Sequence, residues 1–201
     1  SYTGPVLLSG EVSGVCFHEF FGHRVEGSRM KSGMDAQTLK KKIGESVLPE
    51  RLSITFDPTL SRYGSYVLSG GYKYDNEGVR GQKVEVIRNG VLTNFLMSRI
   101  PIEGFAKSNG HGRGILNAGT ETRQSNMIIE SSNPVSSSEL NNLFILELKN
   151  RGLKFGYRID KVSGGLTMTS SASANAFYLN PLIVYRIYAD GSPEEMVRGI
   201  N

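Results

Sequence analysis

Two histidines five residues apart, with a glutamate directly after the first, are the residues of this sequence best suited to chemistry. They lie in residues 18–23, with the sequence HEFFGH. Neutral imidazole is a good zinc ligand, and a catalytic zinc keeps one position open for water, whose pKa the metal lowers toward neutrality. A carboxylate that does not bind the metal can take the proton from this water. The pattern therefore indicates a zinc site with His18 and His23 as ligands and Glu19 as general base.

The spacing of the two histidines predicts a distorted helix. The familiar zinc motif places its histidines four residues apart on one helix face, whereas His18 and His23 are five apart. On a regular helix, five steps put the two rings roughly 140° apart. A shared metal then requires a deformation such as a one-residue π-bulge. Because Gly22 loosens the turn just before His23, we expect a bulged or broken helix near Gly22.

The third ligand of such a site is an open question, because two nitrogens are too few for zinc. Cys16 precedes His18 by two residues, but its apolar surroundings favour a small buried hydrophobic side chain. Glu26 follows His23 by three residues, either as an oxygen ligand or partner of a ligand, or as a surface charge at a helix end. The alternative for the whole motif is two half-buried histidines on an amphipathic helix beside a solvated glutamate.

A glycine-rich stretch at residues 109–114, NGHGRG, is the second candidate site. It lacks the strand–loop–helix context and the Lys-Ser/Thr pair of a phosphate-binding loop. It lies in a long predicted loop over residues 104–122, and a loop of this length is usually functional or disordered. We expect Asn109, His111 and Arg113 to line a substrate cleft, and His111 could also approach the metal. The alternative is a flexible surface loop.

The elements that position these residues are read from periodicity and turn signals. We predict the motif helix over residues 13–25, capped by Ser13 and ended by Gly27. A second helix over 134–152 begins with a capping box from Ser136 to Glu139 and ends at Gly152. Its apolar face comprises Leu140, Leu143, Phe144 and Leu148. Strands are predicted at residues 6–8, 52–57, 84–88, 91–97, 126–130, 166–171 and 183–189.

The clearest local prediction is a hairpin joined by Asn89-Gly90, since this pair tolerates the positive φ angles of a type I′ turn. With 24 glycines and 38% hydrophobic residues, the composition favours a β-rich domain over a helical bundle. We predict an α+β fold of mostly antiparallel sheet, barrel-like or curved, against which the motif helix packs, with one further amphipathic helix. The polar segment 30–49, with a modest helical signal at 36–43, is expected to be a mobile excursion or lid.

Composition narrows the classes of partner. The formal net charge of +4 is mild, and apart from Lys40-Lys41-Lys42 the basic residues are scattered. Direct nucleic-acid binding would predict a denser basic stripe with interleaved aromatic residues. The single Cys16 excludes an internal disulfide and fits a reducing compartment, and no apolar run approaches the roughly 20 residues of a membrane span. We therefore expect a cytoplasmic protein with no nucleic-acid or membrane partner.

Several motifs in a fixed order give the chain a family resemblance. His18-Glu19-x-x-Gly22-His23-x-x-Glu26-Gly27 resembles the signature of the TldD/PmbA family, also called modulators of DNA gyrase. The further matching motifs are Asp75-Asn76-Glu77-Gly78, Gly81-Gln82, Asn89-Gly90, Ser108-Asn109-Gly110 with Arg113, Arg123 with Ser125-Asn126, Ala189-Asp190-Gly191 and Val197-Arg198-Gly199. The resemblance covers nearly the whole chain, and the ordered set is more specific than any one motif.

The resemblance implies a zinc metallopeptidase that acts on small or unfolded peptides. In the family His18 and His23 would be ligands and Glu19 the catalytic carboxylate, and the third ligand would be a cysteine in a glycine-rich segment beyond Asn201. The family pairs a metal-bearing TldD-like subunit, which this chain resembles, with a related subunit that lacks the motif. A homo- or heterodimer is therefore expected.

Family members are longer and have an N-terminal domain. Residues 1–201 are thus expected to be a fragment of the catalytic part, without that domain and without the cysteine segment, and the activity of the fragment itself is left open. Ser28 departs from the acid that the family often has after Glu-Gly. The rival interpretation is a non-catalytic regulator or partner, for example one that acts on DNA gyrase.

Overall fold

The computed structural model describes residues 2–31, 33, 37–115, 119–170 and 176–199. The chain divides into two units. The first comprises Ser1–Glu19, Pro134–Leu166 and Phe177–Asn201, and the second comprises Phe20–Asn133 and Thr167–Ala176. That residues 1–201 are part of a longer catalytic region stays a prediction.

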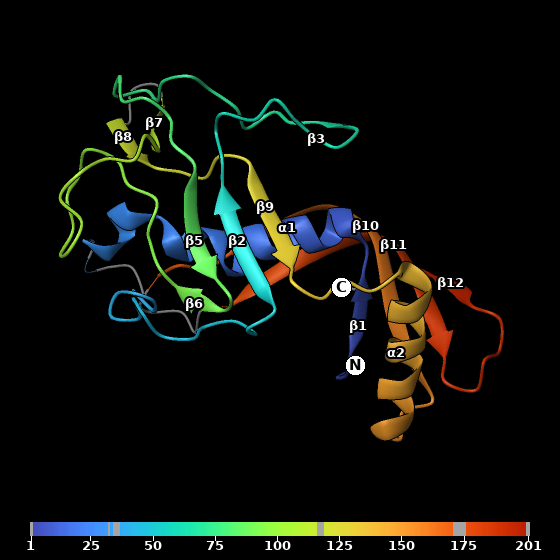
Figure 1. Cartoon of the computed structure of the whole chain (residues 1–201). Helices are drawn as coiled ribbons and strands as arrows, with labels where there is room; N and C mark the ends of the chain where they lie inside the picture. The colour runs from blue at the N-terminus through green and yellow to red at the C-terminus, as the bar shows by residue number, and fades with distance from the viewer. Residues whose placement is uncertain (1, 32, 34–36, 116–118, 171–175, 200–201) are drawn as a thin grey trace. The chain divides into compact units, whose positions relative to one another are not determined.

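The first unit contains a four-stranded sheet in the order β1-β10-β11-β12 (Figure 1). Its strands are β1 (Val6–Leu8), β10 (Phe155–Thr167), β11 (Phe177–Tyr188) and β12 (Glu195–Val197). β1 pairs with β10 in parallel, and β11 pairs with β12 antiparallel. The predicted strand at 6–8 is confirmed. The strand predicted at 183–189 is present but belongs to the longer β11.

Helix α2 (Ser137–Asn150) forms the core of the first unit together with β11. Its capping box is confirmed, since the Ser136 hydroxyl accepts a hydrogen bond from the Glu139 amide at 3.1 Å. Of the predicted apolar face only two members are buried: Phe144 and Leu148 pack against Ile187 and Ala189. Leu140 and Leu143 are exposed, so the stripe that faces the sheet is narrower than predicted.

The second unit contains a four-stranded sheet in the order β6-β5-β2-β9, in which every pairing is antiparallel. Its strands are β2 (Leu52–Phe56), β5 (Val84–Arg88), β6 (Val91–Leu92) and β9 (Met127–Ser131), and Figure 1 shows β5, β2 and β9 side by side. The side chains of Ile54, Phe56, Val86, Ile87 and Leu92 are completely buried. Two short hairpins complete this unit: β3 (Arg62–Tyr63) with β4 (Tyr66–Val67), and β7 (Gly112–Ile115) with β8 (Gly119–Thr122).

The hairpin between β5 and β6 has the predicted turn. Asn89 has φ 49° and Gly90 has φ 80°, so both central residues are left-handed, as a type I′ turn requires. The second strand is shorter than predicted and ends at Leu92. Beyond it, residues 44–47 extend this edge of the sheet, because the Gly44 amide donates to Leu92 and the Val47 amide to Gly90.

The predicted fold class is confirmed in its broad form and corrected in detail. The structure is α+β, mostly sheet with two α-helices, but among the described residues the two larger sheets are open and form no closed barrel. The predicted loop 104–122 contains the β7–β8 hairpin. Described residues 37–43 of the segment 30–49 form turns and no helix. The role of that segment as a lid stays a prediction, and part of it lies outside the described residues.

The most serious strand error concerns β10. Sequence periodicity places a strand at 166–171, whereas β10 runs from Phe155 to Thr167, and residues 168–170 lie outside any named strand. Gly156, Gly164 and Gly165 lie within β10, and glycine lowers the strand signal because it has no side chain to pack. The polar pair Arg158–Asp160, joined at 2.8 Å, weakens the pattern further.

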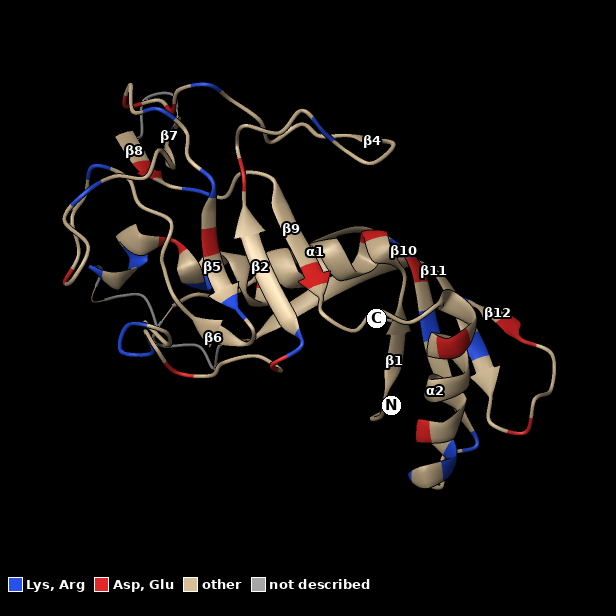
Figure 2. Ribbon diagram, in the orientation of Figure 1, with Lys and Arg blue, Asp and Glu red and all other residues tan. Residues whose placement is uncertain are grey.

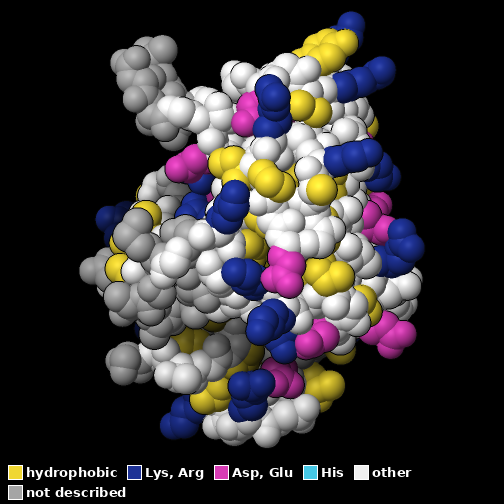
Figure 3. All heavy atoms as spheres, turned by 90° about the vertical axis from the view of Figure 1, so that its left-hand side faces the viewer, with side chains coloured by type: hydrophobic (Ala, Val, Ile, Leu, Met, Phe, Trp, Pro, Cys, Tyr) yellow, Lys and Arg dark blue, Asp and Glu magenta, His cyan; other side chains and the backbone are white. Residues whose placement is uncertain are grey.

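Charged residues of both signs are interspersed along the ribbon of both units (Figure 2). On the face shown in Figure 3, lysine and arginine side chains alternate with acidic and hydrophobic ones. The absence of a nucleic-acid partner stays a prediction. Neither helix in the described part of the chain is long and apolar enough to cross a membrane.

The β5–β6 turn generates the first testable prediction. A Cβ at position 90 would combine a left-handed φ with overlap of the Leu48 carbonyl oxygen. Gly44 has a similar φ of 83° but open space around it, so it is a matched control. We expect Gly44→Ala to lower the free energy of unfolding by about 1 kcal/mol and Gly90→Ala by about 2–4 kcal/mol, since the overlap adds to the strain. Equal losses in urea denaturation would show that the contact with Leu48 is unimportant.

Candidate metal centre

The first part of the metal motif lies in helix α1 (Gly10–Phe20). The helix begins three residues earlier than predicted, and its cap is Ser9 instead of Ser13. The Ser9 hydroxyl accepts a hydrogen bond from the Val12 amide at 3.2 Å, and the Ser13 amide donates to the Ser9 carbonyl. Ser13 is thus an interior residue of the helix. Two turns of α1 therefore precede His18 and Glu19 and support the first part of the motif.

The helix breaks where the five-residue spacing predicts. α1 ends at Phe20, Phe21 has φ −117° and ψ −51°, and a 3₁₀ helix, η1, spans Gly22–Val25. The deformation is a break and not a π-bulge. The backbone at Gly22 lies so close to the Gln124 side chain that a Cβ would overlap the Gln124 amide oxygen. A Cβ at position 22 would therefore require the Gln124 side chain to move.

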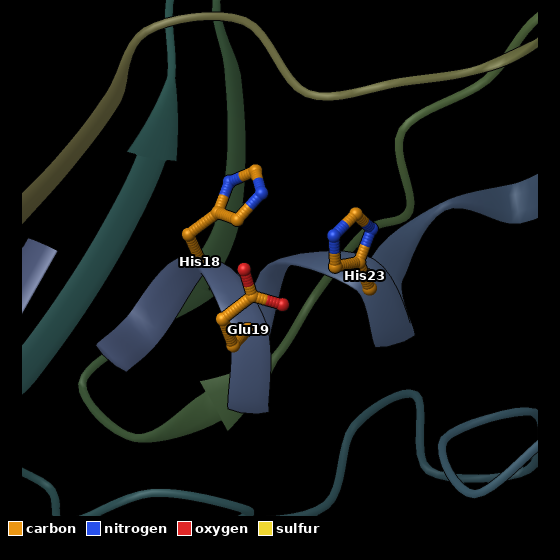
Figure 4. A group of neighbouring side chains, drawn as sticks. All are labelled: His18, Glu19 and His23. Atoms are coloured by element: carbon orange, nitrogen blue, oxygen red, sulfur yellow. The ribbon is translucent and has the colours of Figure 1, made fainter. Parts of the chain in front are cut away.

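The break gathers the three motif side chains. One potential ligand atom from each of His18, Glu19 and His23 lies within 4.8 Å of the others. Figure 4 shows the Glu19 carboxylate turned toward the space between the two imidazole rings. Two imidazoles suit zinc as donors, and a carboxylate beside them suits proton transfer from a metal-bound water. Among the described residues, neither Cys16 nor His111 belongs to this cluster.

Glu19 owes its position to the close approach of β10. The Glu19 residue is only 7% exposed, and a Cβ built on Gly165 would lie 2.8 Å from the Glu19 Cγ. The same Cβ would lie 3.0 Å from Leu179. The glycine thus leaves space for the glutamate side chain. Nothing in the local sequence links Gly165 to Glu19, which is why sequence reasoning missed it.

Glu26 is completely buried and binds His23. His23 Nδ1 lies 3.0 Å from Glu26 Oε1, the contact expected of a carboxylate that orients a metal-binding histidine. The Arg29 and Arg123 guanidinium groups both contact Oε2. Burial raises the pKa of Glu26, but the hydrogen bond from His23 and the charges of His23 and Arg29 outweigh it, so the net shift is downward. Glu26 is therefore not the surface charge that was its alternative interpretation.

Known proteins resemble this chain in sequence. Residues 1–200 match the model of the PmbA/TldA metallopeptidase C-terminal domain. The chain belongs to the PmbA/TldD family. A metalloprotease of Archaeoglobus fulgidus is 38% identical over 94 residues, which are 47% of this chain and 20% of the relative. The zinc metalloprotease TldD homolog of Saccharolobus solfataricus is 35% identical over 95 residues, again 47% of this chain and 20% of the relative.

The fold of the PmbA/TldD family is also recognisable in a solved structure. The crystal structure of TldE from Thermococcus kodakarensis superposes with a TM-score of 0.61 at 21% identity, covering 96% of this chain and 38% of that one. The matched region spans about a fifth of the length of these curated relatives. The activity of the whole protein is therefore a matter for proposal.

The glycine-rich stretch of this PmbA/TldD domain is more structural than predicted. His111 is completely buried. Its Nε2 lies 2.9 Å from the Ser125 hydroxyl, and its Nδ1 lies 3.1 Å from the Asn109 amide oxygen. Burial lowers the pKa of His111 to about 4. These contacts place His111 in the interior of the second unit, and its predicted place at a substrate cleft stays a prediction.

Asn109 and Arg113 also make contacts within the fold. Asn109 accepts a hydrogen bond from the Met97 amide at 2.7 Å and donates one to the Phe95 carbonyl at 2.8 Å. The Arg113 guanidinium lies 4.3 Å from the centre of the Tyr72 ring. Arg113 is half-buried on β7 and keeps some exposure. A substrate-binding role for Asn109 and Arg113 stays a prediction.

The burial of His111 generates a pH prediction. Its folded pKa of about 4 lies below the ordinary value of about 6.5, so the unfolded chain binds a proton that the folded chain refuses between these values. The stability due to neutral His111 is complete above pH about 6.5 and is lost as the pH falls toward about 4. We expect this loss to reach about 3 kcal/mol.

His111→Gln should remove most of this loss, since glutamine keeps hydrogen-bonding groups but does not titrate. The measurement is the free energy of unfolding of both proteins across this pH range, each relative to its own value near pH 7. If the two proteins lose the same stability, His111 is not a buried neutral histidine.

Proposed function

We propose that this chain carries the metal centre of a zinc-dependent peptidase that hydrolyses small or unfolded peptides. The observation that carries the proposal is the cluster of His18, Glu19 and His23 within 4.8 Å, in a chain that belongs to a metallopeptidase family. His18 and His23 would hold the metal. A cysteine in a segment after Asn201 would be the third protein ligand.

Zinc, when bound there, would supply a water of lowered pKa and polarise the scissile carbonyl. Glu19 is placed beside the two ligands to take the proton from that water and pass it to the departing amine. Its burial suits this work, since a carboxylate in a dry site interacts more strongly with nearby positive charge than one in water. The break after Phe20 brings the proton acceptor and the metal ligands together without a distant element.

The proposed substrate class is the one that the family resemblance implies, and the proposed mode of binding follows from the chemistry of an extended peptide. An extended peptide presents unpaired amide and carbonyl groups, and adding it as a strand to a sheet edge would satisfy them. We propose this mode of binding, together with a homo- or heterodimer with a related subunit. A cytoplasmic location belongs to the same set of proposals.

The rival proposal is a non-catalytic regulator, for example of DNA gyrase. It predicts that both histidines and Glu19 can be replaced without functional cost. The contact between the partly buried His23 and the buried Glu26 favours the metal site, because a carboxylate that orients a histidine is expected of a metal ligand.

Glu19→Gln tests the proposed reaction in the intact protein. The amide keeps the size of the side chain but cannot accept the proton, so we expect peptidase activity to fall by roughly 10²–10⁴-fold, while zinc content, measured by X-ray fluorescence, stays near that of the wild type. Glu11→Gln is the control, because Glu11 is an exposed glutamate in the first turn of the same helix. Unchanged activity in Glu19→Gln would exclude Glu19 as the base, and absence of zinc from the intact wild type would favour the regulator.

Gly165→Ala tests the support of Glu19. The new Cβ would overlap the Glu19 Cγ, and a displacement of about 1 Å can cost about 10²-fold in rate. We expect such a loss with zinc still bound. Gly156→Ala, on the same strand, overlaps Leu148 and Phe144 instead, each at 2.7 Å, and should lower stability but not the rate of the folded enzyme. Similar rates for both variants would show that Gly165 has only a packing role.

A further inference from the structure

A cluster of charged side chains surrounds the Glu26 carboxylate in the second unit. Oε1 faces His23 Nδ1 at 3.0 Å. Oε2 accepts from Arg29 Nε at 2.7 Å and from Arg123 Nη1 at 3.1 Å. One carboxylate oxygen is therefore committed to the histidine and the other to two guanidinium groups. Arg123 comes directly after β8, 97 residues along the chain from Glu26.

The chain around Glu26 is hydrogen-bonded to two other segments, at Leu96 and at Thr122. Glu26 forms an isolated parallel bridge with Leu96, and the Gly27 amide donates to the Leu96 carbonyl at 2.8 Å. Ser28 and Thr122 each donate their amide to the other's hydroxyl, at 3.3 and 3.2 Å. Ser28, where an acid is common in the family, thus joins this segment to the end of β8. Arg123 is the next residue, so its position relative to Glu26 is fixed by backbone contacts.

We propose that Arg123 is a positioning residue of the metal centre, which holds the Glu26 carboxylate so that Glu26 in turn fixes the orientation and tautomer of His23. This inference rests on the proposed function, because it takes His23 as a metal ligand. Arg123 touches neither the metal nor the substrate in this scheme. It acts through Glu26 alone.

The physical argument begins with the burial of Glu26. An ionised carboxylate out of water is costly unless it is paired and hydrogen-bonded. Arg29 and Arg123 pair with Oε2, and this leaves Oε1 as the acceptor for the His23 Nδ1–H. With the proton on Nδ1, the lone pair of the neutral ring resides on Nε2, the atom that can bind a metal. In water the opposite tautomer is preferred, so the carboxylate must enforce this one.

Arg123 suits this role because a second acid orients it. Its Nη2 lies 2.5 Å from Glu121 Oε2, while its Nη1 contacts Glu26. A planar guanidinium can bridge two carboxylates in a fixed direction, whereas the single ammonium of lysine cannot. Arg29 is held independently, since its Nη1 donates to the Thr169 hydroxyl at 2.9 Å. Removing Arg123 therefore leaves Glu26 with one guanidinium and more freedom to rotate.

Zinc affinity of the intact protein, measured by competition with a chromogenic chelator, tests the proposal. We expect Glu26→Gln to weaken zinc binding by about 10- to 100-fold and Arg123→Met to weaken it in the same direction by a smaller factor. Arg123→Lys keeps the charge but loses the bridging geometry, and should resemble Arg123→Met. Unaltered zinc affinity in Arg123→Met and Arg123→Lys would overturn the proposal.

Two matched controls separate this role from general damage to the fold. Arg158→Met removes an equally half-buried arginine that pairs with Asp160 and Glu194. Asp75→Asn changes a buried carboxylate that accepts hydrogen bonds from the Glu77, Val79 and Gly112 amides. Both should lose stability without loss of zinc affinity. If Arg158→Met weakens zinc binding as much as Arg123→Met, the effect is structural and the proposal is wrong.

The double variant Glu26→Gln/Arg123→Met tests the order of action. If Arg123 acts only through Glu26, the second substitution should cost no further zinc affinity once Glu26 is changed. If the two substitutions weakened zinc affinity independently, so that their factors multiplied in the double variant, Arg123 would not act through Glu26.

A metal-free measurement distinguishes failure of this proposal from failure of the proposed function. Nitrogen-15 NMR of histidine-labelled intact protein, above the ordinary imidazole pKa of about 6.5, reports the tautomer of His23, assigned with His23→Gln. We expect the Nδ1–H tautomer in the wild type and a shift toward Nε2–H in Arg123→Met. If His23 in the wild type carried its proton on Nε2, or if the tautomer did not change in Arg123→Met, the proposed action of Arg123 through Glu26 would be refuted even if zinc binds. If the wild type bound no zinc but gave the expected tautomers, the proposed function would fail, and the control of the His23 tautomer by Arg123 through Glu26 would stand.

Discussion

The change of helical winding after Phe20 is the constraint on which the candidate site depends. On one continuous α-helix, residues five apart project in different directions. The break at Phe21 and the 3₁₀ turn from Gly22 bring His23 back to the side of His18 and Glu19. Because the start of this 3₁₀ turn at Phe21 has no side-chain cap, packing must stabilise it. The close approach of Gly22 to Gln124 and the hydrogen bonds of the Val25–Gly27 segment to Leu96 supply that packing.

What can be predicted from the sequence is what nearby residues determine. The Asn89-Gly90 turn, the Ser136 cap and the break near Gly22 each depend on a few consecutive residues, and the structure has all three. The fold class follows from composition and alternation in the same way. The predicted cap of α1 is wrong because Ser9 and Ser13 are both of a residue type that caps helices. Only the structure shows that the Ser9 hydroxyl accepts the hydrogen bond from a backbone amide.

The remaining features require partners that are distant in sequence. The glycines of β10 weaken the alternating pattern that indicates a strand. One of them, Gly165, leaves the space that the Glu19 side chain occupies. Arg123 lies in one of the family's motifs, but nothing near it in the sequence indicates its contact with Glu26, which the fold makes. The β7–β8 hairpin in the supposed loop is similar, since much of its sequence is glycine and short polar residues that carry little strand signal. Such contacts are set by the tertiary fold and cannot be inferred from a local motif.

The buried His111 and the partly buried His23 show how the surroundings of an imidazole decide its properties. His111 has a hydroxyl and an amide as side-chain partners, both neutral, and is buried so deeply that its pKa falls to about 4. Such a ring stays uncharged and serves as a hydrogen-bonded filler of the interior. His23 has instead an ionised carboxylate at Nδ1, itself paired with two arginines. A carboxylate partner raises the basicity of the opposite nitrogen, which is the property that a metal ligand needs. Both histidines follow a glycine in the sequence, so the local sequence does not distinguish them. The difference lies in the partner of each ring, which is neutral for His111 and is the charged, buried Glu26 for His23. Arg123, from a segment distant in sequence, holds that carboxylate.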